Sequence, residues 1–137
     1  MRSHTTTIRV RYAECDPMNV AHHSAYLPWF EMGRTELLRS DGVSYASLER
    51  EGGVRLAVVS IEVKYKRPAR YDELLELTTR LVETSRVKII HEYELKREYE
   101  ILATAKTTLA CLDTEGKLQP LPEILERHAA GTVGGAR

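Results

Sequence analysis

Two acids, a cysteine and two histidines lie close together near the N-terminus, as Glu14, Cys15, Asp16, His22 and His23. A carboxylate can act as a nucleophile or a general base, and an imidazole exchanges protons near neutral pH. An apolar run with helical spacing follows, and the start of a helix presents unpaired N–H groups and about half a positive charge. Such a place suits an oxygen that becomes negative, for example the carbonyl oxygen of a thioester under attack. Asp16 is the best-placed acid, although Asp16-Pro17 is also explained as the break that ends a strand.

The two histidines and the cysteine have less specific interpretations. A zinc site needs three or four ligands, and neighbouring side chains on an extended segment point in opposite directions. We therefore expect His22 and His23 to form a polar loop pair, or to include one catalytic histidine, and we predict no metal site. Cys15 lies beside two acids, which disfavour its thiolate, so we interpret it as a small apolar filler rather than a nucleophile.

Two further groups of charges are open to more than one interpretation. Glu31 stands three residues before Arg34, which allows either an ion pair along a helix or a second acid lining the same cleft. The segment 64–73 is rich in cations. Such a segment is most often a solvated turn, but it could also receive the phosphate groups of an elongated ligand.

The spacing of apolar residues predicts the elements that position these groups. Residues 5–14 alternate as in a half-buried strand, and apolar residues recur every three or four positions over 24–40, as in an amphipathic helix. Ser24 is the expected N-cap of this helix, which stops at Asp41-Gly42. A short helix follows, with Ser44 as its cap and Gly52 as its end. Four strand-like runs and a last short helix complete the pattern, over 54–68, 73–84, 86–100, 101–113 and 121–130.

The run 86–100 indicates a sheet with one covered face. Its odd-numbered residues are mostly apolar or aromatic, and its even-numbered residues are mostly charged. Because helices and strands are segregated along the chain, we predict an α+β fold in which about five antiparallel strands wrap around the one long helix, the hotdog arrangement. A single sheet leaves edges exposed, so self-association is expected. We expect one domain over 1–130 and a C-terminal tail over 131–137.

Composition excludes several classes of function. The 20 Lys and Arg residues balance 20 Asp and Glu residues, which argues against a general nucleic-acid binder, since such a protein needs a basic surplus. The two cysteines, Cys15 and Cys111, are far apart and indicate a reducing compartment rather than a disulfide scaffold. No run approaches about 18 apolar residues, so no membrane span is predicted. We therefore expect a soluble, cytoplasmic protein.

Two segments resemble a known family. The sequence RYAECDPMNVAHHSAYLPWFEMGRTELLR is similar to the signature of the YbgC/FadM-like acyl-CoA thioesterases of the 4-hydroxybenzoyl-CoA thioesterase type. In that signature a His and a Tyr follow the catalytic Asp by seven and ten positions, as His23 and Tyr26 follow Asp16 here. The sequence KRPARYDELLEL resembles a second signature further along the family, so the resemblance spans nearly the whole chain.

The resemblance implies a hotdog protein that forms homodimers or homotetramers with active sites at the dimer interface. Carried over, Asp16 is the catalytic carboxylate of an acyl-CoA thioesterase, and the backbone N–H of His23 polarises the thioester carbonyl. The His23 side chain and Tyr26 would line the acyl site, and the phosphates of CoA would lie near Lys64 and Arg67. CoA enters as part of the substrate, and no cofactor is implied.

One position departs from the family pattern. Asn19 stands three residues after Asp16, where the family usually has Gly. Asparagine tolerates a left-handed backbone better than other non-glycine residues, so the turn is expected to survive, while the Asn19 side chain could contact or narrow the path of the substrate. The departure therefore bears on substrate choice more than on the type of reaction.

Two other functions remain open at this point. Hotdog hydratases and dehydratases of acyl thioesters resemble Asp-x-Asn-Pro-x-His, but here no Pro follows Asn19 and the histidines fall six and seven positions after Asp16. A non-catalytic module that binds acyl thioesters would keep the groove and tolerate loss of Asp16. Neither the acyl group nor the thiol carrier, CoA or an acyl-carrier protein, follows from the sequence, although the zero net charge favours CoA over an acidic carrier.

Overall fold

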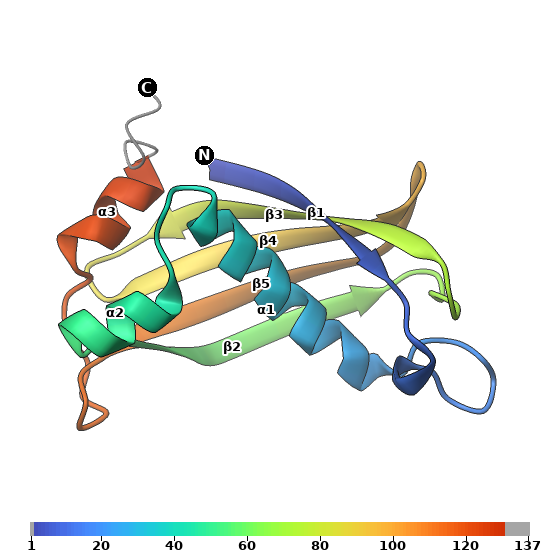
Figure 1. Cartoon of the computed structure of the whole chain (residues 1–137), viewed down its shortest axis with the longest axis horizontal. Coiled ribbons are helices and arrows are strands. Elements are labelled where there is room, and N and C mark those ends of the chain that lie inside the picture. The colour runs from blue at the N-terminus through green and yellow to red at the C-terminus, as the bar shows by residue number, and fades with distance from the viewer. Residues whose placement is uncertain (1, 131–137) are drawn as a thin grey trace.

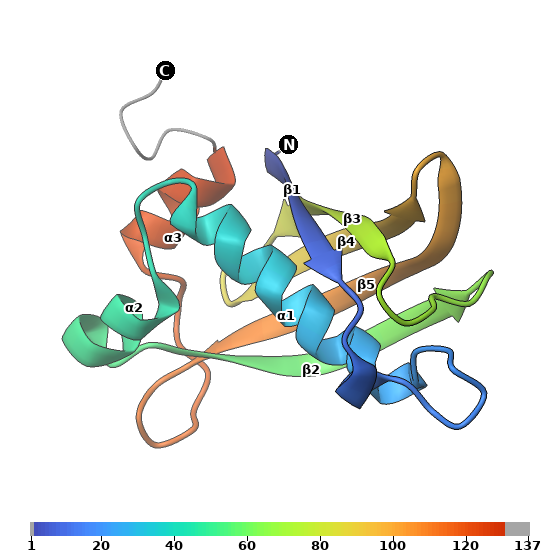
Figure 2. The same ribbon diagram turned by 45° about the vertical axis from the view of Figure 1, so that its right-hand side comes forward.

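Five antiparallel strands form one sheet that curves around a long helix (Figures 1 and 2). The computed structural model describes residues 2–130, except the side chains of Glu51 and Ala130, so the predicted tail at 131–137 lies outside the described residues. The strands are β1 (Arg2–Arg9), β2 (Arg55–Tyr65), β3 (Leu74–Thr84), β4 (Lys88–Arg97) and β5 (Glu100–Leu112). They pair in the order β1-β3-β4-β5-β2. The predicted α+β hotdog fold is confirmed.

Helix α1 (His23–Arg39) crosses the inner face of the sheet and packs mainly against β1 and β3. One stripe of the helix is buried, as its apolar spacing predicts: Ala25, Tyr26, Trp29, Phe30, Gly33, Leu37 and Leu38. Gly33 marks the closest approach, because a Cβ built at this position would lie 2.3 Å from Oγ1 of Thr79 on β3. A side chain there would push the helix away from the sheet.

Two short helices close the end of the sheet near the C-terminus of α1. Helix α2 (Tyr45–Gly52) starts as predicted, since the Ser44 hydroxyl accepts the Ser47 N–H at 3.1 Å. It ends at Gly52, as predicted, and the next residue, Gly53, caps it with the left-handed φ of +61° that favours glycine. Helix α3 (Glu123–Ala130) places His128 against the buried Asp41, which also pairs with Arg2 of β1.

The ends of three other predicted elements were wrong. The first strand stops at Arg9, and residues Tyr12–Glu14 form a 3-10 turn, because the Glu14 carboxylate accepts the Arg11 N–H at 2.7 Å. The second predicted strand ends at Tyr65 rather than at residue 68. Residues 86–100 do not form one strand, since β4 ends at Arg97 and the chain turns at Glu98, which has a φ of +55°.

The covering of the sheet is uneven. On β4 the inward-facing Ile89, His91, Tyr93 and Leu95 are all buried, as the alternation predicts. At the opposite side β2 forms a free edge of the sheet. Its register with β5 directs Val58, Ile61 and Tyr65 to the inner face, yet these side chains remain 46%, 39% and 51% exposed. Helix α1 therefore leaves part of the inner face of β2 open, while Leu56 and Val63 of the same face pack against the core.

Candidate active site

Asp16 lies at the turn of a tight hairpin that leads into α1. Cys15 and Ala21 pair across the hairpin, and the Asp16 N–H donates to the Val20 carbonyl at 3.0 Å. The Asp16 carbonyl accepts the Asn19 N–H at 2.9 Å, and its carboxylate oxygen Oδ1 accepts the Met18 N–H at 2.9 Å. One carboxylate oxygen is thus fixed by the backbone, while Oδ2 has no hydrogen bond in the described structure.

Asn19 has a φ of +65°, in the left-handed region where glycine is favoured. A left-handed residue after a tight turn is typical of a three-residue hairpin with a bulge. This geometry gives a physical reason for Gly in the family pattern, and asparagine keeps the turn, as expected. The Asn19 side chain is exposed.

The hairpin is held against the rest of the fold from two sides. The Ala21 N–H donates to the Ala69 carbonyl at 2.7 Å, and Val20 pairs with Arg70. On the other side, the Glu14 carbonyl accepts the His22 N–H at 2.8 Å, and the Glu14 carboxylate accepts the Trp29 indole N–H at 2.9 Å. Burial alone would raise the pKa of Glu14, but hydrogen bonds from Arg11 and Trp29 outweigh it, so the pKa lies below its ordinary value.

The start of α1 differs from the prediction in one respect. His22, not Ser24, is the N-cap, because the His22 Nδ1 accepts the Ser24 N–H at 3.2 Å and also contacts the Ser24 hydroxyl at 2.9 Å. The Ala25 N–H donates to the His22 carbonyl at 2.9 Å. In the described part of the chain this leaves the His23 N–H as the amide at the helix start that has no partner.

The rings of His22 and His23 were expected to point in opposite directions, as on an extended segment, but they lie side by side. Their centroids are 4.1 Å apart, because His23 is already the first residue of the helix. Across residues 2–130, no group of three or more His, Cys, Asp or Glu side chains has an arrangement that could hold a metal ion. Burial, together with Glu14 and Asp16, raises the pKa of the Cys15 thiol, as the sequence predicts.

Two hollows of about 310 Å³ flank the start of α1. Asp16, His22 and Ser24 line the first, together with Glu14 and Pro28. His23, Tyr26 and Tyr65 line the second, together with Lys66 and Arg67. The helix start therefore separates the candidate carboxylate from the candidate acyl-lining residues within one chain. His23 lines the second hollow and not the first.

Tyr26 is almost entirely buried beside the second hollow. Its ring lies 4.9 Å from that of Trp29 and meets the ring of Tyr65 edge to face, also at 4.9 Å. Burial raises the pKa of its hydroxyl, against a hydrogen bond from the backbone of Ala69. Sequence reasoning missed Tyr65, which belongs to no recognisable spacing, and it assigned no role to Ala69, although Ala69 lies in the second family signature.

The two predicted phosphate contacts lie on different faces. Arg67 borders the second hollow, although its guanidinium forms an ion pair with Glu100 at 3.1 Å. Lys64 points to the outer face of the sheet, in a hollow with Glu62, Arg80 and Lys106, and is thus not brought together with the helix start. The exposed Lys66 is the cation that joins Arg67 at the second hollow.

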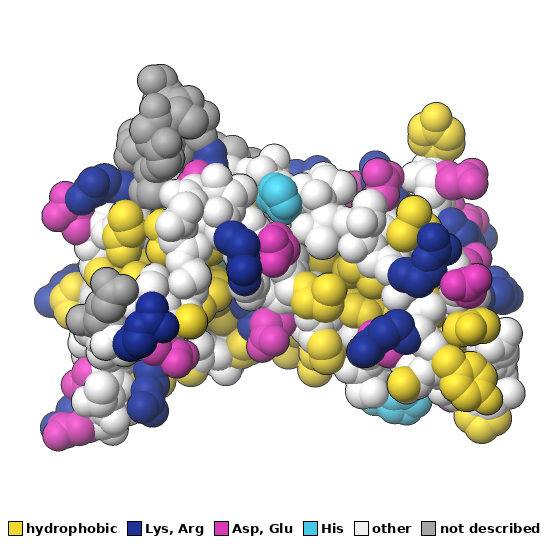
Figure 3. Space-filling model, viewed as in Figure 1, with side chains coloured by type: hydrophobic (Ala, Val, Ile, Leu, Met, Phe, Trp, Pro, Cys, Tyr) yellow, Lys and Arg dark blue, Asp and Glu magenta, His cyan; other side chains and the backbone are white. Residues whose placement is uncertain are grey.

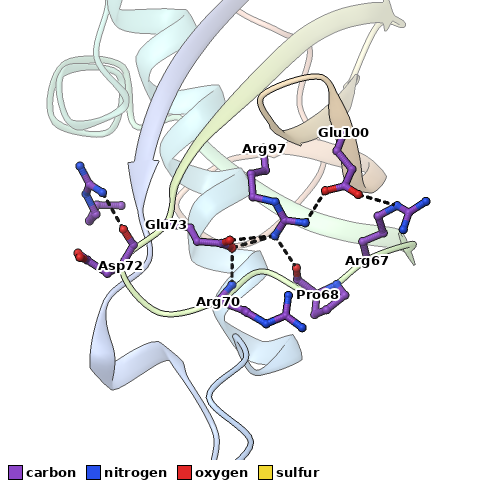
Figure 4. Close-up of polar contacts among 8 residues, drawn as sticks. Arg67, Pro68, Arg70, Asp72, Glu73, Arg97 and Glu100 are labelled. Atoms are coloured by element: carbon purple, nitrogen blue, oxygen red, sulfur yellow. Dashed lines mark hydrogen bonds and ion pairs between the residues drawn. The ribbon is translucent and has the colours of Figure 1, made fainter.

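Arg97 fixes the loop that carries Arg67 (Figure 4). Its guanidinium donates to both carboxylate oxygens of Glu73, at 2.9 and 3.1 Å, and to the Pro68 carbonyl at 3.1 Å. It also pairs with Glu100, so the two acids and the two arginines form one network. The loop 66–73 is therefore rigidly placed between the β4–β5 turn and the hairpin of Asp16. No pattern in the sequence indicates this role of Arg97.

Glu31 is not close to Asp16 in the folded chain. It is exposed on α1, eight residues after His23, and this spacing corresponds to roughly 12 Å along a helix. It lines a separate pocket between α1 and α2, together with Arg34 and Tyr45. In the described structure no ion pair joins Glu31 to Arg34.

The model of the thioesterase-like superfamily matches residues 10–128. The chain belongs to this superfamily. It is 32% identical over 123 residues to the acyl-CoA thioesterase YbgC of Haemophilus influenzae, an alignment that covers 90% of each chain.

Solved structures with a similar fold agree with this assignment. A hypothetical protein from Thermus thermophilus is 35% identical with a TM-score of 0.88, over 93% of this chain and 97% of that one. A DHNA-CoA thioesterase from Staphylococcus aureus is 28% identical with a TM-score of 0.81, over 97% of each chain. None of the helices among residues 2–130 is long and apolar enough to cross a membrane.

Proposed function

We propose that this protein hydrolyses acyl-CoA thioesters, with Asp16 as the catalytic carboxylate. The observation that carries the proposal is the junction of the hairpin and α1, where a carboxylate oxygen and the unpartnered His23 N–H flank the same helix start. The relative from Haemophilus influenzae is named an acyl-CoA thioesterase, and the match to it covers 90% of this chain.

Two routes through Asp16 are consistent with this arrangement. As a general base, Asp16 accepts a proton from water while the water oxygen bonds to the thioester carbonyl carbon. As a nucleophile, Asp16 attacks that carbon itself and forms an anhydride, which water then hydrolyses. In both routes the carbonyl oxygen becomes negative beside the His23 N–H and the helix start. The C–S bond then breaks, the thiolate of CoA takes up a proton, and a free acid is released.

CoA is proposed as part of the substrate, without a separate cofactor. Its phosphates would lie near the cations Lys66 and Arg67 beside the second hollow, which replaces the earlier expectation for Lys64. We also propose a cytoplasmic location, since Cys15 and Cys111 are both free thiols.

We further propose that the working form is a homodimer joined along β2. Among residues 2–130 no strand pairs with the outer edge of β2, and exposed apolar side chains lie on its inner face and at its bulge, notably Val58, Val59 and Ile61. Figure 3 shows exposed hydrophobic side chains near the middle of the molecule, on the side of the sheet that carries α1. A second copy that pairs its own β2 edge in antiparallel fashion would satisfy the open backbone groups and cover this apolar surface.

Release of free thiol from a panel of short, long and aromatic acyl-CoAs, by the wild-type protein and by Asp16→Asn, tests the proposed activity. Asparagine retains an oxygen that can accept the Met18 N–H, so the turn survives while the charge is lost. We expect turnover to fall at least 100-fold with folding intact, which corresponds to about 2.7 kcal/mol of transition-state stabilisation.

Asp113→Asn is the matched control for this experiment. Asp113 fixes a remote turn in the same manner, with its carboxylate accepting the N–H groups of Glu115 and Lys117. This variant should keep full activity. Equal turnover by wild-type protein and Asp16→Asn would contradict the role of Asp16, and no release from any acyl-CoA would contradict the thioesterase activity itself.

A further inference from the structure

The loop 66–73 joins β2 to β3 and lies against the hairpin that carries Asp16. Its Ala69 carbonyl accepts the Ala21 N–H at 2.7 Å, and Ala21 pairs with Cys15 across the hairpin. Ala69 itself is fully buried. Because the hairpin places the carboxylate, the position of the Ala69 carbonyl bears directly on the position of Asp16.

A second contact joins the same loop to the hairpin. Arg70 pairs with Val20, whose carbonyl accepts the Asp16 N–H at 3.0 Å. The Arg70 N–H in turn donates to the Glu73 carboxylate at 2.7 Å. Glu73 is therefore linked to Asp16 through two intervening residues.

Arg97, at the end of β4, supports both contacts (Figure 4). Its Nη1 donates to the Glu73 carboxylate at 2.9 Å and to the carbonyl of Pro68, the neighbour of Ala69, at 3.1 Å. Its Nη2 donates to Glu100. A planar guanidinium with five donors can meet three acceptors at once, whereas the ammonium of a lysine has no such fork.

These contacts form a route from Arg97 to the candidate carboxylate. In the described structure no hydrogen bond or ion pair joins Arg97 to Asp16, so any effect passes through the loop. Resting on the proposed thioesterase function, we propose that Arg97 is a positioning residue for the hydrolysis. Acting through Glu73 and Pro68, it holds the loop 66–73 and the adjoining hairpin in the arrangement that aims the Asp16 carboxylate at the thioester.

The expected effect of Arg97 is local rather than global. The side chains of Arg97 and Glu73 are 23% and 26% exposed, and ion pairs that water reaches contribute little to the stability of a whole fold. A loop without its support nevertheless opens more often. Because a misplacement of about 1 Å costs up to roughly 100-fold in rate, turnover is more sensitive to this opening than stability is.

Arg97→Met tests the proposal in thiol release from an acyl-CoA. The variant keeps the length of the side chain and removes the guanidinium, so kcat should fall about 10-fold as the Asp16 carboxylate leaves its productive position. Arg97→Lys should recover only part of this loss, since a single ammonium lacks the fork. Lys96→Met is the matched control, because it removes the neighbouring cation and its ion pair with Glu94, and it should keep full turnover.

A double-mutant cycle separates positioning from a general loss of structure. If Arg97 acts through the Asp16 carboxylate, Arg97→Met should change the remaining turnover of Asp16→Asn by less than about twofold. A loss of about 10-fold in both backgrounds would mean that Arg97 contributes only to the amount of folded protein, and it would overturn the proposal. Glu73→Gln should show the same non-additivity, and it replaces Arg97→Met in the cycle if that variant does not fold.

Hydrogen exchange of the Ala21 amide measures the proposed action without any substrate. This N–H donates to the Ala69 carbonyl, so it should exchange about 10-fold faster in Arg97→Met than in the wild-type protein. The amide of Tyr93, on the central strand β4, should exchange at the wild-type rate. Equal exchange of the Ala21 amide in the two proteins would overturn the proposal.

The outcomes separate the role of Arg97 from the thioesterase function. A wild-type protein that releases CoA, together with an unchanged kcat in Arg97→Met, overturns the positioning role alone. A wild-type protein that releases no CoA from any acyl-CoA overturns the thioesterase function and the catalytic role of Arg97 with it, whatever the exchange of the Ala21 amide. Circular dichroism of each variant keeps a folding defect from imitating either result.

Discussion

Asn19 reverses the chain between Asp16 and the start of α1, with a φ of +65°. Asn19→Ala should destabilise the protein by about 1–2 kcal/mol, because alanine adopts this conformation less readily than asparagine. The variant should also lower kcat/KM, since the turn fixes the Asp16 carboxylate. Asn19→Gly should keep the stability, and any change it causes in the preferred acyl-CoA isolates the effect of the Asn19 side chain.

Urea unfolding and thiol release, measured on the same preparations, check these expectations. Equal stability of the alanine variant and the wild-type protein would show that the hairpin does not depend on a left-handed residue at this position. Lower stability of the glycine variant would instead point to a contact made by the Asn19 side chain.

Single residues also show where sequence reasoning succeeds and where it stops. The turn from Asp16 to Asn19 was predictable because its chemistry is contained in a few neighbouring residues. His22 was missed as the N-cap because histidine is not among the usual capping residues, and Ser24 is. Arg97 was missed because its partners, Glu73 and Glu100, meet only through the pairing of separate strands.

Strand β4 carries a buried histidine whose protonation affects the stability of the fold. His91 faces the inside of the sheet and is buried, and its Nδ1 atom has no hydrogen-bond partner. Burial, with smaller contributions from Arg34 and His128, lowers the pKa of His91 from 6.5 to about 3. The folded protein therefore keeps this side chain neutral at pH values where the unfolded chain protonates it.

This difference predicts an acid-sensitive fold. The contribution of the neutral His91 to the free energy of unfolding is complete above pH 6.5. It is lost as the pH falls towards 3, because in this range only the unfolded chain binds a proton at His91. The free energy of unfolding should fall by about 1.4 kcal/mol per pH unit for this one proton. In His91→Leu the slope between pH 6 and 4 should be smaller by about 1 kcal/mol per pH unit.

Urea titrations at several pH values measure the two slopes, and His4→Gln on β1 serves as the histidine control. Some acid sensitivity should persist in His91→Leu, since burial also lowers the pKa of His128 against the opposing effect of Asp41. Identical slopes for wild-type protein and His91→Leu would contradict the neutral state of the buried His91.

Elements with a long, regular pattern were predictable, and their ends were not. The alternation of β4 and the apolar stripe of α1 follow from side-chain periodicity alone. The turn at Glu98 was missed because it has no Gly, Asn or Pro, and a bulge next to it lets Leu102 and Ala103 both be buried. Tertiary pairing, rather than a local preference, reverses the chain there.

At the scale of the whole molecule, the open face of β2 predicts how the protein assembles. Ile61→Lys should convert the proposed dimer to a monomer, because it places a charge on the apolar inner face that a second copy would cover. Turnover per chain should fall at least 10-fold, since the family resemblance implies active sites at the dimer interface. Sedimentation of the variant at increasing concentration, with thiol release on the same samples, measures both effects.

Leu118→Lys is the matched control, because Leu118 is also an exposed apolar residue but lies outside β2. It should sediment and react as the wild-type protein does. A monomeric wild-type protein, or an Ile61→Lys variant that stays dimeric, would contradict assembly through β2. A fully active monomeric Ile61→Lys would contradict the dependence of the active site on the dimer.

The buried carboxylate of Asp41 has a consequence for how a new chain folds. Its two partners come from opposite ends of the described structure, Arg2 from the first strand and His128 from the last helix. A nascent chain that has emerged only as far as β5 contains the acid and the arginine but lacks the imidazole. Because leaving a buried polar group without its partner costs about 1–3 kcal/mol, the sheet cannot reach its full stability during translation. Asp41 therefore ties completion of the fold to the synthesis of α3, so that a truncated product stays incompletely stabilised and open to proteolysis.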